Sequence, residues 1–190
     1  MSTARQLDSI SVDEYLSGEL RSAIKHEYVG GVVYAMAGGS NAHNMVKGNI
    51  FASLHQQLRG RPCRPFDSDT KIRIRLSTQV RFYYPDVSVV CRPNPQDDSF
   101  QDEPVVVVEV LSPETRRTDE GEKKDAYLTI PSLAAYLLVD PRSASLVAFG
   151  RAEQGFVGQA YEGFDAVVPL AEIGAELRLE EVYAGIEFPP

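Results

Sequence analysis

The chain has 190 residues, of which 43% are hydrophobic and 24% are charged, and its formal net charge is −8. That length suits one hydrophobic core, so we expect a single globular domain over residues 1–190. The net negative charge argues against a surface adapted throughout to a polyanion, and no apolar run is long enough for a signal peptide or a membrane span. We therefore expect a soluble, cytoplasmic protein that does not enter a membrane.

Two local features differ from this average. Residues 59–81 carry seven cations against only Asp67 and Asp69, a pattern that most often marks a solvated strand-and-loop face. Cys63 and Cys91 are far apart in the chain and belong to no C-x-x-C pair, so neither a zinc knuckle nor a redox motif is indicated. We expect two buried thiols.

The N-terminal third is predicted to contain a helix, a hairpin and a second helix. Ser11 lies three residues before Glu14, the spacing of a capping box, so a short helix is expected to about Glu19. Gly30 and Gly31 separate two β-rich runs and permit a two-residue hairpin turn. Residues 43–59 are predicted to form an amphipathic helix, because apolar residues recur at intervals of four: Val46, Ile50, Leu54 and Leu58.

The rest of the chain reads as strands with one intervening helix. Residues 71–76 and 83–90 are strand-like, and 104–111 is apolar at almost every position, as in a central strand covered on both faces. A helix over 117–130 ends before Pro131, a buried strand follows over 133–141, and several strands and a helical turn complete the tail. This order predicts an α/β fold, a mixed central sheet flanked by helices with an N-terminal hairpin and a β-rich C-terminal extension.

Two acidic residues occupy unusual positions in these strands. Asp86 directly precedes an apolar strand and Glu109 lies inside another, where an ionised group is costly unless a partner or an ion compensates. Each has an ordinary explanation by itself, since Asp86 could cap a strand after Pro85 and Glu109 could pair with a buried arginine. If the strands are neighbours, however, the carboxylates meet at one sheet edge and form an oxygen-rich site suited to Mg²⁺ or Mn²⁺.

The order of these motifs resembles that of a known family. "YAMAGGSNAHN", "YPDVSVV", "VVVEVLSPETRRTDEGEKKDAY" and "YLLVDP" follow one another over most of residues 27–141. The series is similar to that of the bacterial Uma family of predicted restriction endonucleases, in the PD-(D/E)XK nuclease superfamily. The resemblance implies a restriction-endonuclease-like fold and makes Asp86 and Glu109 metal ligands, with the Val110 carbonyl as a further ligand.

The sequence departs from the superfamily pattern at one catalytic position. Two residues after Glu109 the pattern has lysine, and this chain has Leu111. The family resemblance implies that the lysine comes from the following helix, where Asp119, Lys123 and Tyr127 are spaced by four and share one helical face. Lys123 is the favoured catalytic lysine, and Lys124 is the competing candidate. The alternative for Lys123 is an ordinary exposed ion pair with Asp119.

Two N-terminal residues are possible auxiliary members of the site, together with Tyr127. His43 matches a family histidine at the start of the long helix and could contact water or phosphate, or could simply be satisfied by hydrogen bonds. Glu27 matches a family glutamate in the hairpin and is either a third acid near the metal or a surface charge.

These observations predict a Mg²⁺- or Mn²⁺-dependent endonuclease that hydrolyses phosphodiester bonds in nucleic acid, with DNA as the favoured substrate and Asp86, Glu109 and Lys123 as catalytic residues. Cutting both strands usually requires two sites, so a homodimer is expected by analogy. The alternatives are a non-cleaving binding module that retains the fold, favoured by the acidic composition and Leu111, and a phosphoesterase that acts on a small nucleotide.

Overall fold

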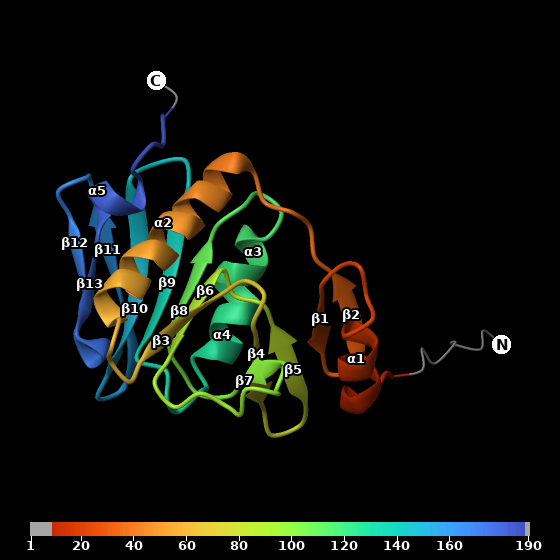
Figure 1. Cartoon of the computed structure of the whole chain (residues 1–190). Helices are drawn as coiled ribbons and strands as arrows, with labels where there is room; N and C mark the ends of the chain where they lie inside the picture. Colours follow the sequence, from red (N-terminus) through yellow and green to blue (C-terminus); the bar gives the residue numbers. More distant parts are fainter. Residues whose placement is uncertain (1–8, 189–190) are drawn as a thin grey trace.

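The computed structural model describes residues 9–188 of the chain (Figure 1). Residues 1–8 lie outside the described part, so the expectation that the N-terminus holds no signal peptide stays a prediction. No helix within residues 9–188 is long and apolar enough to span a membrane.

The N-terminal elements form as their local sequence predicts. Helix α1 (Val12–Glu19) begins with the capping box, in which the Glu14 amide donates to the Ser11 hydroxyl and the Ser11 amide donates to the Glu14 carboxylate. Strands β1 (His26–Val29) and β2 (Val32–Ala35) form the predicted hairpin. Gly30 and Gly31 have φ angles of 55° and 100°, values that glycine adopts without steric cost.

A six-stranded mixed sheet forms the centre of the fold (Figure 1). Its order is β11 (Gly155–Glu162), β10 (Ser145–Ala152), β9 (Ala135–Asp140), β8 (Pro104–Val110), β6 (Val87–Val90) and β3 (Arg64–Asp67). Strands β8 and β9 are parallel and the other neighbours are antiparallel, so the predicted mixed sheet is confirmed. Strand β3 lies at one edge and was not predicted.

A second sheet packs beside the first, and the remaining tail covers one end of the central sheet. Its order is β2, β1, β5 (Val80–Tyr83), β4 (Lys71–Arg75) and β7 (Phe100–Gln101). The tail contains β12 (Val167–Leu170), the turn η2 (Ala171–Ile173), β13 (Ala175–Arg178) and α5 (Leu179–Val182). The predicted tail strands and final helical turn are therefore confirmed, and β7 and β13 are additional.

One long hairpin passes through both sheets and bends where it crosses between them. Strand β3 continues into β4, and β5 continues into β6. The partners Asp67 and Val87 belong to the central sheet, and the next partners, Ile72 and Tyr83, belong to the second sheet. Four residues, 68–71, therefore lie opposite three, 84–86. An extra residue of this kind bends a strand and redirects its side chains, and here the bend contains Asp86.

The central sheet is covered on both faces, which explains why β8 is so apolar. Helix α2 (Asn41–Leu58) buries its predicted stripe, including Ile50 and Leu54, against one face. The other face packs against β4, β5 and the helical segment that follows β8. That segment was predicted as one helix and consists of three pieces: α3 (Arg116–Thr118), the π-helical turn η1 (Asp119–Lys123) and α4 (Lys124–Tyr127).

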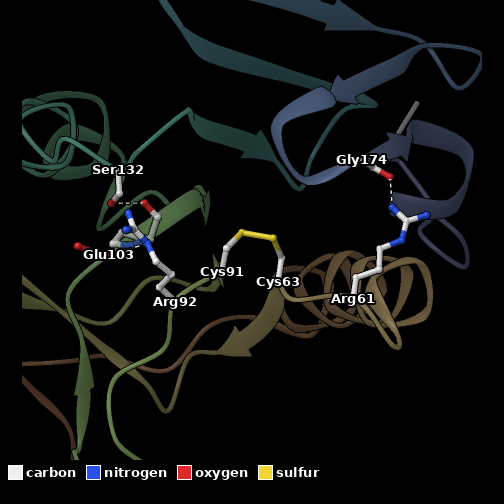
Figure 2. Close-up of a disulfide and its surroundings, with 8 residues drawn as sticks. Arg61, Cys63, Cys91, Arg92, Glu103, Ser132 and Gly174 are labelled. Atoms are coloured by element: carbon white, nitrogen blue, oxygen red, sulfur yellow. Dashed lines mark hydrogen bonds and ion pairs between the residues drawn. A yellow bond between two sulfur atoms is a disulfide. The ribbon is translucent and has the colours of Figure 1, made fainter.

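The prediction of two buried thiols was wrong, because Cys63 and Cys91 form a disulfide (Figure 2). Cys63 directly precedes β3 and Cys91 directly follows β6. The register of these antiparallel strands, with Arg64 opposite Val90, places the two cysteines opposite each other at the next position. The sequence did not predict this pairing, because the two cysteines are 28 residues apart and only the strand register brings them together. Disulfides are rare in the cytosol, so the cytoplasmic location stays a prediction.

Burial of the α2 stripe predicts a matched pair of stability effects. Leu54 is fully buried, so Leu54→Ala should lower the free energy of unfolding by about 2–5 kcal/mol through lost transfer energy and an added cavity. Gln56 is exposed on the same helix, and Gln56→Ala should change it by less than about 0.5 kcal/mol. Urea denaturation measures both, and equal effects would contradict this placement of the helix.

Candidate active site

The structure brings Asp86 and Glu109 together as neighbours on adjacent strands. Strands β6 and β8 are antiparallel with Val87 opposite Val108, so the next positions in this register are Asp86 and Glu109. The Val110 amide donates to Asp86 Oδ2 over 2.8 Å, which fixes this carboxylate against β8. The convergence expected from the two strands is therefore observed.

Glu109 is a carboxyl group enclosed by protein. The residue is 3% exposed, and its Oε1 atom has no hydrogen-bond partner. Burial raises the pKa of Glu109 well above its ordinary value, and the charges of Asp119, Asp86 and Glu27 act in the same direction, whereas Lys123 opposes them. The acidic side chains therefore interact closely enough to affect one another's protonation.

The Lys123 ammonium lies within this acidic cluster. Its Nζ atom is 2.7 Å from Glu27 Oε1, 3.5 Å from Asp119 Oδ1 and 3.9 Å from Glu109 Oε1. Burial by itself would lower the pKa of Lys123, but the carboxylates outweigh that effect and raise it. The lysine is therefore held in its charged form.

Three carboxylates surround this ammonium, and they come from separate segments. Glu27 belongs to the hairpin, Glu109 to β8 and Asp119 to the π-helical turn. Burial raises the pKa of Glu27 and of Asp119 in spite of the nearby lysine. Glu27 is thus a member of the cluster and is largely buried. Asp119 was not predicted as a site residue, although its spacing of four from Lys123 was the available signal.

His43 and Tyr127 complete the walls of the site. His43 Nε2 lies 3.2 Å from Asp86 Oδ2. Burial would lower the pKa of His43, but the hydrogen bond and charge of Asp86 outweigh it and raise the pKa. Tyr127 is fully buried, its hydroxyl has no hydrogen-bond partner, and its pKa is raised by burial and by the charge of Glu109.

The structure separates the two candidate lysines. Lys123 points into the carboxylates, whereas the Lys124 ammonium lies over the Phe149 ring, 5.0 Å from its centre. Leu111 is buried in the apolar cluster on the same face of the sheet. Lys123, and not Lys124, is therefore the lysine that lies among the carboxylates, and its catalytic role in place of a lysine at position 111 stays a prediction.

The donor atoms at this site fit a hard divalent cation in kind. Glu109 Oε1 and Asp119 Oδ1 are buried oxygens without a hydrogen-bond partner, and oxygen ligands are those preferred by Mg²⁺ and Mn²⁺. Within residues 9–188, however, no group of three or more His, Cys, Asp or Glu side chains is arranged to hold an ion. The predicted set of Asp86, Glu109 and the Val110 carbonyl uses only two side chains, so the metal site stays a prediction.

Sequence comparison with known proteins gives three relevant matches. The Uma2 family model, described as "Putative restriction endonuclease", matches residues 12–180. "Uncharacterized protein slr1290" of Synechocystis sp. is 36% identical over 181 residues, which cover 94% of each chain. A second Synechocystis protein, "Uncharacterized protein sll1609", is 31% identical over 134 residues, covering 69% of this chain and 75% of that protein.

A solved structure shares the architecture described above. A crystal structure of "a putative nuclease belonging to DUF820 from Anabaena variabilis" superposes with a TM-score of 0.75. The match covers 94% of this chain and 99% of that one, with 16% sequence identity. At that identity the likeness shows the fold, and it confirms the predicted fold class.

Because the pKa of Glu109 is raised, we expect that replacing its carboxyl by a neutral group stabilises the fold by an amount that depends on pH. A carboxyl whose folded pKa is raised destabilises the fold above that pKa, and the penalty vanishes as the pH falls below its unfolded value of about 4.3. In EDTA, Glu109→Gln should therefore raise the free energy of unfolding at pH 8, and the gain should shrink toward pH 4.5. Urea denaturation across this range measures the difference.

Glu172 supplies the control for this experiment, because it is an exposed carboxylate remote in sequence from the cluster. Glu172→Gln should change the free energy of unfolding by less than about 0.5 kcal/mol at each pH. A loss of stability in Glu109→Gln at pH 8, or a gain that does not vary with pH, would contradict the buried, proton-binding carboxyl described here.

Proposed function

Because the chain belongs to the Uma2 family, we propose that it is a metal-dependent endonuclease that hydrolyses phosphodiester bonds in nucleic acid, with DNA as the favoured substrate. The observation that carries this proposal is the position of Lys123, whose buried ammonium lies 3.9 Å from Glu109 Oε1, while Asp86 is held against the same strand by the Val110 amide. Carboxylates without a cation beside them would serve only to bind a metal ion. A fixed cation next to it also suits the negative charge that develops at a phosphate.

In the proposed mechanism, Asp86 and Glu109 hold Mg²⁺ or Mn²⁺ together with the Val110 carbonyl. A bound ion of this kind supplies a Lewis acid for the phosphate and lowers the pKa of a water. The residues of the chain perform the remaining tasks. Lys123 stabilises charge on the phosphate oxygens or orients the attacking water, and it can do so because it stays protonated in this acidic environment.

The surrounding residues position these groups. His43 contacts Asp86, so the histidine and the Val110 amide together restrict the orientation of that carboxylate. Glu27 takes the shortest contact to Lys123 and sets the location of its ammonium. Rigid support of this kind matters because small displacements of a catalytic group reduce the rate strongly.

A non-cleaving binding module is the second candidate, and two observations favour it. Lys123 already neutralises part of the acidic cluster, and no triad of ligating side chains occurs in the described residues. A homodimer belongs to the nuclease proposal as an expectation, since cleavage of both strands of a duplex calls for two sites.

Metal binding separates the two candidates without any nucleic-acid substrate. For the nuclease we expect Mg²⁺ or Mn²⁺ to raise the melting temperature of the wild type in a concentration-dependent way, because the ion binds only the folded state. The increase should be lost in Glu109→Gln, which removes one charged ligand. Differential scanning fluorimetry measures both titrations, and no response in the wild type would favour the binding module.

Cleavage of a labelled oligonucleotide tests the catalytic assignment with two adjacent lysines. Lys123→Met should reduce metal-dependent cleavage at least about 100-fold, a typical effect of removing one charge-stabilising donor. Lys124→Met should leave the rate within about twofold, because that ammonium lies over Phe149 and outside the cluster.

Loss of Lys123 also leaves buried carboxylates without their cation and is expected to cost about 3–5 kcal/mol of stability, so folding is checked by circular dichroism. Asp86→Asn, which is nearly isosteric, provides a second test that does not depend on Lys123. Full cleavage by a folded Asp86→Asn protein would refute the assignment.

A further inference from the structure

A cavity of 1010 Å³ lies beside the outer edge of β3, away from the carboxylate cluster. The C-terminal end of α2, the strand β3 and the loop of residues 93–99 form its walls. Strand β3 is the last strand of the central sheet, so within residues 9–188 no strand pairs with its outer edge (Figure 1). None of the residues in the proposed cleavage mechanism lines this cavity.

The cavity gathers the unpaired part of the basic stretch at residues 59–81. Of its seven cations, Arg73 and Arg75 pair with Asp102, and Arg81 pairs with Glu122. The other four line the cavity: Arg59, Arg61, Arg64 and Lys71. Only two acidic residues line it, Asp69 and Asp98, and Asp69 is already paired with Lys25. The cavity is therefore locally cationic in a protein whose net charge is −8.

Several donors in this cavity are free to bind an anion. Arg59 and Arg64 are exposed and form no ion pair with any residue between 9 and 188. Arg61 donates to the Gly174 carbonyl over 2.6 Å, and Figure 2 shows its side chain extending toward Gly174. Arginine binds phosphate well, because its planar group offers paired donors.

Lys71 is the buried member of this set. The residue is 4% exposed and lines the cavity, and its only hydrogen-bond acceptor in the described part of the chain is the Tyr84 hydroxyl at 3.2 Å. An ammonium has three donors, so two of them remain for a ligand in the cavity. The Tyr84 hydroxyl in turn donates to Glu19, which places one carboxylate a single hydrogen bond away from this ammonium.

The cavity is connected to the carboxylate cluster by the hairpin bend. Residues 69–71 of the bend line the cavity, and the opposite segment, 84–86, contains Asp86. Two further cations reach Ser68 at this point: Lys25 Nζ donates to its carbonyl over 2.8 Å, and Lys47 Nζ donates to its hydroxyl over 3.2 Å. Lys25 is paired with Asp69, so Lys47 is the cation at this point that has no ion-pair partner among residues 9–188.

We propose that this cavity binds the sugar–phosphate backbone of the nucleic-acid strand that flanks the bond to be cleaved. The inference rests on the proposed function, and it assigns the strand a path along the edge of β3 from the bend to the end near the disulfide. Cations lie at both ends of this path, as repeated phosphates require. Pro65, Phe66 and Pro93 add apolar surface for sugars and bases.

Binding of fluorescent oligonucleotides, measured by anisotropy in EDTA, tests this path independently of cleavage. The probes are a single strand of about 20 nucleotides and the corresponding duplex, a length that exceeds common single-strand site sizes. Arg59→Ala/Arg64→Ala should weaken binding at least about tenfold and reduce the dependence of log K on log salt by about 1–2. Its melting temperature should not change, because neither side chain has an ion-pair partner among residues 9–188.

The single variant Arg64→Ala is measured as well, and Arg178→Ala is its matched control. Arg178 is an exposed arginine outside the cavity, paired with Glu176 and Glu180. Arg178→Ala removes the same charge and should leave the affinity within about twofold. Equal losses in the two single variants would show a general charge effect and overturn the assigned path.

The remaining outcomes distinguish this inference from the proposed cleavage. Weakened binding by the double variant supports the path even if the wild type cleaves nothing, a result that would refute only the nuclease. Unchanged binding by the double variant, or no binding by the wild type, overturns the path. Binding of thymidine 5′-monophosphate tests whether the cavity takes a small anion instead. If this nucleotide binds as tightly as the oligonucleotide, and its binding is lost in the same double variant, the cavity is a small-ligand site and the proposed strand path is wrong.

Discussion

The contact on which the rest of this site depends is that of the Lys123 ammonium with three buried carboxylates. Burying ionised groups is costly, and the charge of Lys123 offsets only part of that cost, because burial still raises the pKa of Glu109 and of Asp119. Glu27, Glu109 and Asp119 come from the hairpin, the central sheet and the π-helical turn, so a single cation links three parts of the fold. The same contacts keep the lysine charged, which is the state that the proposed cleavage mechanism requires.

The bend in the long hairpin is the second constraint. One extra residue opposite segment 84–86 turns the strand pair from one sheet into the other, and Asp86 lies where the direction changes. Strand β6 then runs beside β8, which places Asp86 next to Glu109. The opposite segment of the bend lines the cationic cavity. One irregularity in strand pairing therefore positions an acidic group on one side and the end of a basic surface on the other.

The distribution of charge is more informative than its sum. The net charge of −8 argues against a generally basic surface, yet the cations near β3 gather where few carboxylates oppose them. Glu109 and Asp119 are buried and lie around Lys123, so they do not form an open negative surface. A polyanion could approach this arrangement, because its repulsion from the buried acids is offset by the lysine and by the cations along the edge strand.

The sequence by itself determined the features that depend on local spacing. The capping box of α1, the Gly30–Gly31 turn, the α2 stripe and the apolar strand that carries Glu109 all follow from residues within a few positions of one another. The tertiary structure decided what depends on contacts between distant segments. These features are the disulfide between Cys63 and Cys91, the short edge strand β3 and the burial of Asp119. They also include the position of Lys123 among the carboxylates, whereas Lys124 lies over Phe149. Adjacent lysines have nearly the same local sequence, and only the packing of the helical segment against the sheet decides which one faces the carboxylates.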